Sequence, residues 1–314
     1  GLAFPLTEIW PLAWLAFVPL LVLQHGVSVK RMWLFAFTAG MSFWLVLASW
    51  MQVFHPLSLV TALPALALYF SLPFALLHVW QRWRPVRFDF LDAFVFATLW
   101  IGIEYLRSTG FLGYSWGVVG YSQYQVLPVL QIADIGGVWA VSWLVVAVAG
   151  VFSRWLVASD AVARRRQLRG AVYPVAGLLL CVLVYGTVRL TETAGGPLYR
   201  VALVQAVTDP ASDWQNERIM RQTMARIERL SIKAATGRPD LVAWSETLSS
   251  PAALFYHKYF AQAAPDSRFR RVGDWFTGMP GRIGCEMLLT APHKDYAVVT
   301  NEAGIVGRDL QSYN

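Results

Sequence analysis

The sequence predicts a multi-pass α-helical membrane bundle followed by a water-facing α/β unit. The 314 residues are 56% hydrophobic and only 14% charged, whereas about a quarter of the residues of a soluble domain are charged. Six apolar stretches follow one another up to residue 190, and each has near the roughly 20 residues that cross a hydrocarbon core. Strand-like and helix-like segments then alternate, so we expect domains at 1–192 and 193–314.

The six apolar stretches are separated by short basic or Gly/Pro-containing connectors. One such stretch can be a buried core helix, but six in succession are typical of a membrane protein. We therefore expect about six spans. They run approximately over Ile9–Leu23, Met32–Phe54, Leu57–Trp80, Phe90–Leu106, Val126–Leu156 and Ala171–Leu190.

Basic residues mark alternate connectors, which predicts the orientation of the spans. The connectors His55-Pro56 and Ser108–Gln125 contain no Lys or Arg. The basic connectors should share the cytoplasmic side, so the chain after about Thr191 lies outside and one more helix is expected before Gly1. Because basic residues punctuate apolar stretches instead of forming one patch, the net charge of +7 does not indicate nucleic-acid binding. The basic connectors hold Lys30, Arg31, Arg82, Arg84, Arg87, Arg154, Arg164, Arg165, Arg166 and Arg169.

The last third of the chain begins after a turn-rich linker, Thr193–Pro197. Its apolar runs are short and its one long amphipathic segment is charged, which favours a layered α/β fold. Strands are expected at Tyr199–Ala206, Asp240–Trp244, Cys285–Thr290, Tyr296–Thr300 and Ile305–Leu310, helices at Asp213–Ala235 and Pro251–Gln262, and a turn at Asn301–Gly304.

Glu246 is the first candidate for chemistry. It follows a short buried strand and Trp244, and α/β folds place catalytic groups at the carboxyl ends of strands. A carboxylate partly shielded by a Trp there can act as a general base. Alternatively, Ser245 and Glu246 only start the next element as a helix N-terminal cap. The spacing alone favours this second interpretation.

Several segments resemble known families. Val201–Ala206 with Trp214, followed by Leu241–Glu246, resembles the start of a nitrilase-type domain. The order of the upstream motifs, together with the helix bundle, resembles apolipoprotein N-acyltransferase, the integral membrane enzyme that N-acylates bacterial lipoproteins. The family usually has Trp-Pro-Glu where this chain has Trp244-Ser245-Glu246, which puts local rigidity in doubt but retains the carboxylate. The upstream motifs are Gly1–Pro5, Trp10-Pro11, Leu99-Trp100, Glu104–Arg107, Gly113–Trp116 and Gly120–Gln123.

The resemblance implies a nitrilase-like αββα sandwich, present here in part, on the periplasmic side of the bacterial inner membrane. It implies a Glu–Lys–Cys triad in which the Cys takes an acyl group from a phospholipid as a thioester and passes it to the α-amino group of a diacylglyceryl-cysteine on an apolipoprotein. Glu246 matches the general base. The Lys and the Cys are expected beyond Asn314, so the chain alone should be inactive. No metal or cofactor is expected.

Four further residues have two interpretations each. Trp214 matches a family Trp near the mouth of the active site, where it can hold an acyl chain or headgroup, or it simply precedes a helix. Lys258 and Cys285 are candidates for the Lys and the Cys of the triad, but both are nearer to Glu246 than the family's Lys and Cys. We therefore expect a solvated helix residue at Lys258 and a small buried side chain at Cys285. Glu104 stands one helical turn from an arginine, so it is a functional candidate or part of a snorkelling structural pair with Arg107.

Two other functions remain open. The first is a different membrane-anchored nitrilase-like amidase or acyltransferase. The second is a non-enzymatic membrane scaffold or transporter with an outer sensor domain. A transporter predicts paired intramembrane charges or helices broken at matching positions in two halves, and the sequence offers no convincing pair.

Overall fold

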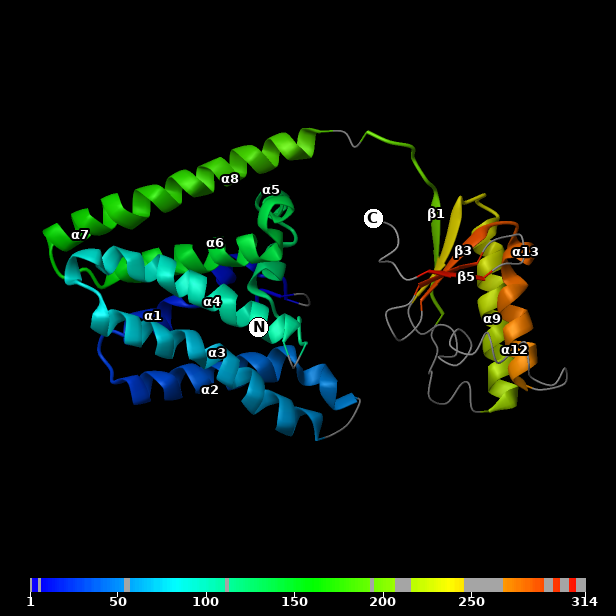
Figure 1. Ribbon diagram of the computed structural model, residues 1–314, viewed down its shortest axis with the longest axis horizontal. Helices are drawn as coiled ribbons and strands as arrows, with labels where there is room; N and C mark the ends of the chain where they lie inside the picture. Colours follow the sequence, from blue (N-terminus) through cyan, green and yellow to red (C-terminus); the bar gives the residue numbers. More distant parts are fainter. Residues whose placement is uncertain are drawn as a thin grey trace. The chain divides into compact units, whose positions relative to one another are not determined.

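The computed structural model describes residues 2–4, 7–53, 57–110, 113–192, 195–206, 216–245, 268–290, 296–299 and 305–308. The chain divides into two compact units, 1–194 and 195–314 (Figure 1). The first is helical, and the second contains a five-stranded sheet with helices. The expected helix at Pro251–Gln262 and the expected turn at Asn301–Gly304 lie outside the described residues.

The helical unit contains long helices joined by short helical turns. Within the described residues, three helices are long and apolar enough to cross a membrane: α3 (Ser58–Trp83), α6 (Ala133–Leu156) and the continuous helix Ala161–Thr191. The other expected spans correspond to the short α1, and to α2 and α4, which are 19 and 18 residues long and carry charged residues. The elements are η1 (Trp10–Trp14), α1 (Val18–Leu23), α2 (Val29–Leu47), η2 (Ser49–Val53), α3 (Ser58–Trp83), η3 (Val86–Leu91), α4 (Asp92–Thr109), η4 (Val119–Gln123), α5 (Leu127–Leu130), α6 (Ala133–Leu156), α7 (Ala161–Gln167), the π-helical turn η5 (Leu168–Val172) and α8 (Tyr173–Thr191).

Helix α4 lies at the centre of the helical unit and packs against α3 and α6. Aromatic rings fill this core, with the rings of Phe17 and Trp100 edge to face at 4.4 Å between centroids. On the far side of α3, a Cβ on Gly40 would lie 3.1 Å from the Cα of Ala67. Glycine thus allows α2 and α3 to pack closely, as small residues do between membrane helices.

The beginning of the chain packs against segments that come much later. The indole Nε1 of Trp14 donates a hydrogen bond of 2.9 Å to Oε1 of Gln123, which lies 109 residues away. Gln123 is fully buried, and its amide nitrogen also donates to the Trp10 carbonyl oxygen at 3.3 Å. These contacts join η1 to η4. They also give the buried amide of Gln123 the hydrogen-bond partners that a buried polar group needs.

The second unit is built on a sheet whose strands follow one another in chain order (Figure 1). Strands β1 to β3 are parallel, and β4 and β5 continue the sheet as antiparallel neighbours. All five expected strands are present. They are β1 (Val201–Val204), β2 (Leu241–Trp244), β3 (Glu286–Thr290), β4 (Tyr296–Val299) and β5 (Ile305–Arg308).

In the described part of this unit, α9 (Glu217–Ala235), α12 (Arg268–Thr277) and α13 (Met279–Ile283) pack on one face of the sheet. Trp275 of α12 donates a hydrogen bond from Nε1 to Glu228 of α9 at 3.0 Å, which joins two of them. Helices α12 and α13 were not predicted from the sequence. On the opposite face of β1, Leu203 is 81% exposed.

Candidate functional site

The carboxyl ends of β1 and β2 form the part of the predicted site that the structure describes. Val204 pairs with Trp244 in the parallel register, and the N–H of Ser245 donates to the Val204 carbonyl oxygen at 3.1 Å. The strand pairing therefore continues to the residue immediately before Glu246. Glu246 itself lies outside the described residues.

Trp244 is directed into the core of the second unit. Its side chain is buried beneath α9, and its indole Nε1 donates to Oγ of Ser231 at 3.0 Å. The ring also packs against Trp275, with 5.7 Å between centroids. With its N–H satisfied and its ring packed, Trp244 anchors the end of β2 to the helical layer.

Of the other residues predicted in the second unit, Trp214 and Lys258 lie outside the described residues, whereas Cys285 lies within them. Cys285 immediately precedes β3, and its side chain is buried, with Sγ 3.3 Å from the Pro239 carbonyl oxygen. The expectation of a small buried side chain at Cys285 is confirmed.

The interpretation of Glu104 and Arg107 as a snorkelling pair is wrong, because both residues are only 3% exposed. Oε1 of Glu104 accepts hydrogen bonds from the Val119 N–H at 2.8 Å and from Nε1 of Trp100 at 3.3 Å. The Glu104 carboxylate therefore holds the segment after α4 against the helix. The i, i+3 spacing of Glu104 and Arg107 could not predict this hydrogen bond, because the Val119 N–H belongs to a segment that comes later in the chain.

Arg107, one turn further along α4, also holds the segment after α4 against the helix. Its Nη1 donates to the carbonyl oxygens of Tyr114 and Trp116 at 2.6 and 2.7 Å. Its guanidinium lies over the Trp44 ring, 4.8 Å from the centroid, a cation–π contact. The two charged residues thus order the connector, and with Phe43, Phe70 and Trp100 they line a small pocket.

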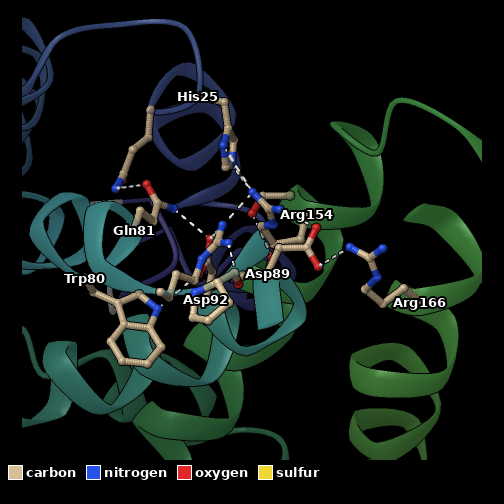
Figure 2. Close-up of polar contacts among 12 residues, drawn as sticks. His25, Trp80, Gln81, Asp89, Asp92, Arg154 and Arg166 are labelled. Atoms are coloured by element: carbon tan, nitrogen blue, oxygen red, sulfur yellow. Dashed lines mark hydrogen bonds and ion pairs between the residues drawn. The ribbon is translucent and has the colours of Figure 1, made fainter. Parts of the chain in front are cut away.

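A buried polar cluster that the sequence analysis missed lies at the other end of α4 (Figure 2). Asp92 accepts hydrogen bonds from Nε1 of Trp80 at 3.1 Å and from Nε2 of Gln81 at 2.8 Å. Arg84 donates to both of its carboxylate oxygens, at 2.5 and 2.9 Å. Arg84 was predicted only to mark the orientation of the spans, although Asp92, eight residues later in the sequence, is its partner.

Arg154 links this cluster to the remaining basic connectors (Figure 2). Its guanidinium lies 3.1 Å from Oδ2 of Asp89 and 2.8 Å from Nε2 of His25. Arg166 lies 3.6 Å from the other oxygen of Asp89. The three basic connectors therefore meet at one end of the bundle, as their charges predict.

His25 is expected to make the helical unit pH-sensitive. Removal from water and then the charge of Arg154 lower the pKa of His25 from 6.5 to about 4. Between those values the unfolded chain binds the proton and the folded chain does not, so stability is complete above about pH 6.5 and is lost as the pH falls toward 4. Because the ring is partly exposed, screening limits the effect to about 1 kcal/mol.

Thermal unfolding in detergent, followed from about pH 7.5 to about pH 4.5, measures this effect. His25→Gln should reduce the loss of stability at low pH. Lys30→Gln, which changes an exposed residue of the same connector outside this cluster, should leave it unaltered. An identical pH profile for His25→Gln and the unsubstituted protein would contradict the assignment.

Within the described ranges, no group of three or more His, Cys, Asp or Glu side chains could hold a metal ion. The chemistry-bearing features are instead the end of β2 and the buried polar groups of α4. Together with three helices of membrane-spanning length, they define a membrane protein whose helical unit precedes an α/β unit.

Comparison with known proteins identifies the family. The profile of the apolipoprotein N-acyltransferase N-terminal domain matches residues 1–151. The apolipoprotein N-acyltransferase of Geobacter metallireducens is 33% identical over 271 residues, covering 82% of this chain and 50% of the relative. That of Azotobacter vinelandii is 30% identical over 294 residues, covering 88% and 54%. Apolipoprotein N-acyltransferase 1 of Treponema denticola is 28% identical over 265 residues, covering 81% and 47%.

The chain belongs to the apolipoprotein N-acyltransferase family. It spans about half the length of the curated relatives that it matches. Matches that cover more than 80% of the chain extend beyond residues 1–151, so the relationship includes part of the second unit as well as the helical unit.

Proposed function

We propose that the whole protein transfers a fatty acyl group from a phospholipid to the α-amino group of the diacylglyceryl-cysteine of bacterial apolipoproteins. The observation that carries the proposal is the similarity to enzymes named for this activity over 88% of the chain. The helical unit would hold the protein in the inner membrane, with the second unit on the periplasmic side. Both substrates are lipids, so an active site at the outer leaflet can receive them from the bilayer.

In this proposal Glu246 is the general base of a Glu–Lys–Cys triad. Its carboxylate takes the proton of the Cys thiol, and the thiolate attacks the phospholipid ester carbonyl. Glu246 then gives this proton to the leaving glycerol oxygen, which yields a thioester and a lysophospholipid. The Lys stabilises the oxyanion of each tetrahedral intermediate. The apolipoprotein amine then attacks the thioester, and Glu246 takes its proton and returns it to the leaving Cys sulfur. The paired end of β2 supports the role, because Glu246 follows Ser245 at the carboxyl edge of parallel strands.

The second unit is proposed to be part of a nitrilase-like αββα sandwich. In such a sandwich each sheet is covered by helices on one face and packs against the other sheet on its second face. The arrangement of the described residues supports this, because α9, α12 and α13 pack on one face while Val201 and Leu203 on the other are 48% and 81% exposed. Trp214 is proposed to lie at the mouth of the site and contact a lipid substrate.

Acyl transfer by the whole protein tests this function. Phospholipid with a labelled acyl chain and a diacylated lipopeptide with a free α-amino group should yield labelled triacylated peptide and lysophospholipid. The same lipopeptide with its amine acetylated should yield no labelled peptide. Hydrolysis of simple amides without transfer would favour the amidase alternative, and no turnover of either substrate would favour the non-enzymatic scaffold.

A further inference from the structure

An apolar groove runs between α6 and the helix formed by α7, η5 and α8. It has a volume of about 430 Å³, within the range of ligand pockets. All of its lining side chains are apolar, among them Val148 and Phe152 of α6 and Val172 and Ala176 of η5 and α8. The surface of the groove is therefore almost entirely apolar.

The helix packing explains why the groove is present. Toward the end of α8, a Cβ on Gly186 would lie 1.8 Å from the Pro128 carbonyl oxygen, so α8 is packed closely against α5. At the π-helical turn, a Cβ on Gly170 would lie 2.6 Å from the ring of Phe90. The helix is held at these two points, and the groove lies beside it along the face toward α6. π-helical turns inside α-helices often occur at functional sites.

One end of the groove lies beside a cluster of exposed arginines. Leu168 and Trp155 line this end, and Arg165 and Arg169 stand three residues before Leu168 and Val172, which places them near the lining residues on the same helix. Arg164 is also exposed. Among the described residues, none of these three arginines forms an ion pair with a carboxylate.

The nearby acidic residues contact other groups and do not form ion pairs with these three arginines. Asp160 caps the start of α7 by accepting a hydrogen bond from the Ala163 N–H at 2.8 Å, and this contact holds the pKa of Asp160 below its ordinary value. Asp89 contacts Arg154 and Arg166 instead. The end of the groove therefore carries an excess of positive charge.

The length of the helix places these arginines at a membrane surface. The continuous helix Ala161–Thr191 has 31 residues, about 46 Å at 1.5 Å per residue, and exceeds the roughly 30 Å hydrocarbon core by several turns. The apolar part is α8, so α7 extends into the headgroup region. Trp155 and Phe152, stacked at 6.4 Å and each 40% exposed, stand where interfacial aromatic residues are expected.

We propose that this groove binds a phospholipid with an anionic headgroup, whose acyl chain lies between α6 and α8 and whose phosphate contacts Arg164, Arg165 and Arg169. Basic pockets between membrane helices bind such headgroups. The arrangement favours a lipid over a protein segment because it combines an apolar groove with positive charge at one end. The site lies at the opposite end of α8 from the linker to the second unit, so this lipid is not the acyl donor of the proposed reaction.

Lipid titration of the whole protein in detergent tests the proposal. Phosphatidylglycerol should raise the melting temperature and stay bound in native mass spectrometry, whereas phosphatidylcholine of the same chain length should do so much less. Glycerol 3-phosphate, which has the charge without the chain, should have no effect. Replacing all three arginines by glutamine should weaken phosphatidylglycerol binding by about 10- to 100-fold.

Two matched controls separate this site from general effects. The substitutions Lys30→Gln, Arg31→Gln and Arg82→Gln remove the same charge from the same end of the bundle and should preserve the lipid preference. Ala176→Trp should fill the groove and displace the lipid, whereas Leu180→Trp, on α8 but outside the lining, should not. Equal effects of the two lipids, or equal losses in the variants and their controls, would overturn the proposal.

Discussion

Replacing Glu246 by glutamine is expected to lower the rate of acyl transfer by at least about 100-fold, the usual contribution of a general base. Glutamine retains the shape of the side chain but cannot accept a proton, so the Cys thiol would remain protonated at neutral pH. The fold should be unaltered, because Ser245 and Trp244 hold the strand end through their own contacts. Transfer from labelled phospholipid measures the rate, and the melting temperature measures the fold.

Glu217→Gln is the matched control for this variant. Glu217 forms exposed ion pairs with Arg221 and Arg271 on the helical layer of the same unit, so its loss removes an equal charge from the surface. Acyl transfer should be retained. If Glu246→Gln transferred acyl groups as fast as this control, Glu246 would not be the base.

Asp92→Ala is expected to destabilise the helical unit by about 3–5 kcal/mol, the cost of removing one partner of a buried ion pair. The side chains of Asp92 and Arg84 are 2% and 10% exposed, so the remaining guanidinium would be left without its counter-charge. Trp80 and Gln81 would also lose their acceptor. Unfolding of the purified protein in detergent, followed by intrinsic fluorescence, measures the loss.

Asp134→Ala provides the comparison, since it removes an ion pair of the same chemistry at an exposed position. The Asp134 and Arg189 side chains are 38% and 41% exposed, and exposed pairs contribute about 1 kcal/mol or less. The double variant Arg84→Met, Asp92→Leu should recover part of the loss, because replacing both buried charges by apolar groups costs less than removing one. Equal destabilisation by Asp92→Ala and Asp134→Ala would contradict the buried role.

Hydropathy located the helical unit well because spanning a bilayer requires a long apolar run. It was less accurate where a helix begins or ends in polar residues. Helix α2 begins at Val29, three residues before the expected start, because Lys30 and Arg31 continue the helix beyond its apolar part. Helix α12 was missed because its buried residues Val272 and Trp275 follow a run rich in arginines, in a helix of only ten residues.

Prediction of the site was limited by contacts between distant segments. The expected strand before Glu246 is present as β2 because a short apolar run bounded by polar residues is a strong strand signal. The roles of Glu104 and Arg107 could not be predicted, since their partners are backbone groups of the connector after α4. Spacing rules describe neighbours on one helix, and they contain no information about where a later loop folds back.

The contacts of the first helices also set the order in which the protein can be completed during synthesis. His25 meets Arg154 across 129 residues of chain, so at roughly 5–20 residues per second the partner is made about 6 to 26 s later. Until then, the polar groups near His25, and the indole of Trp14 that later meets Gln123, lack their final partners. The amino-terminal part of the bundle therefore remains incompletely packed until α6 has been synthesised.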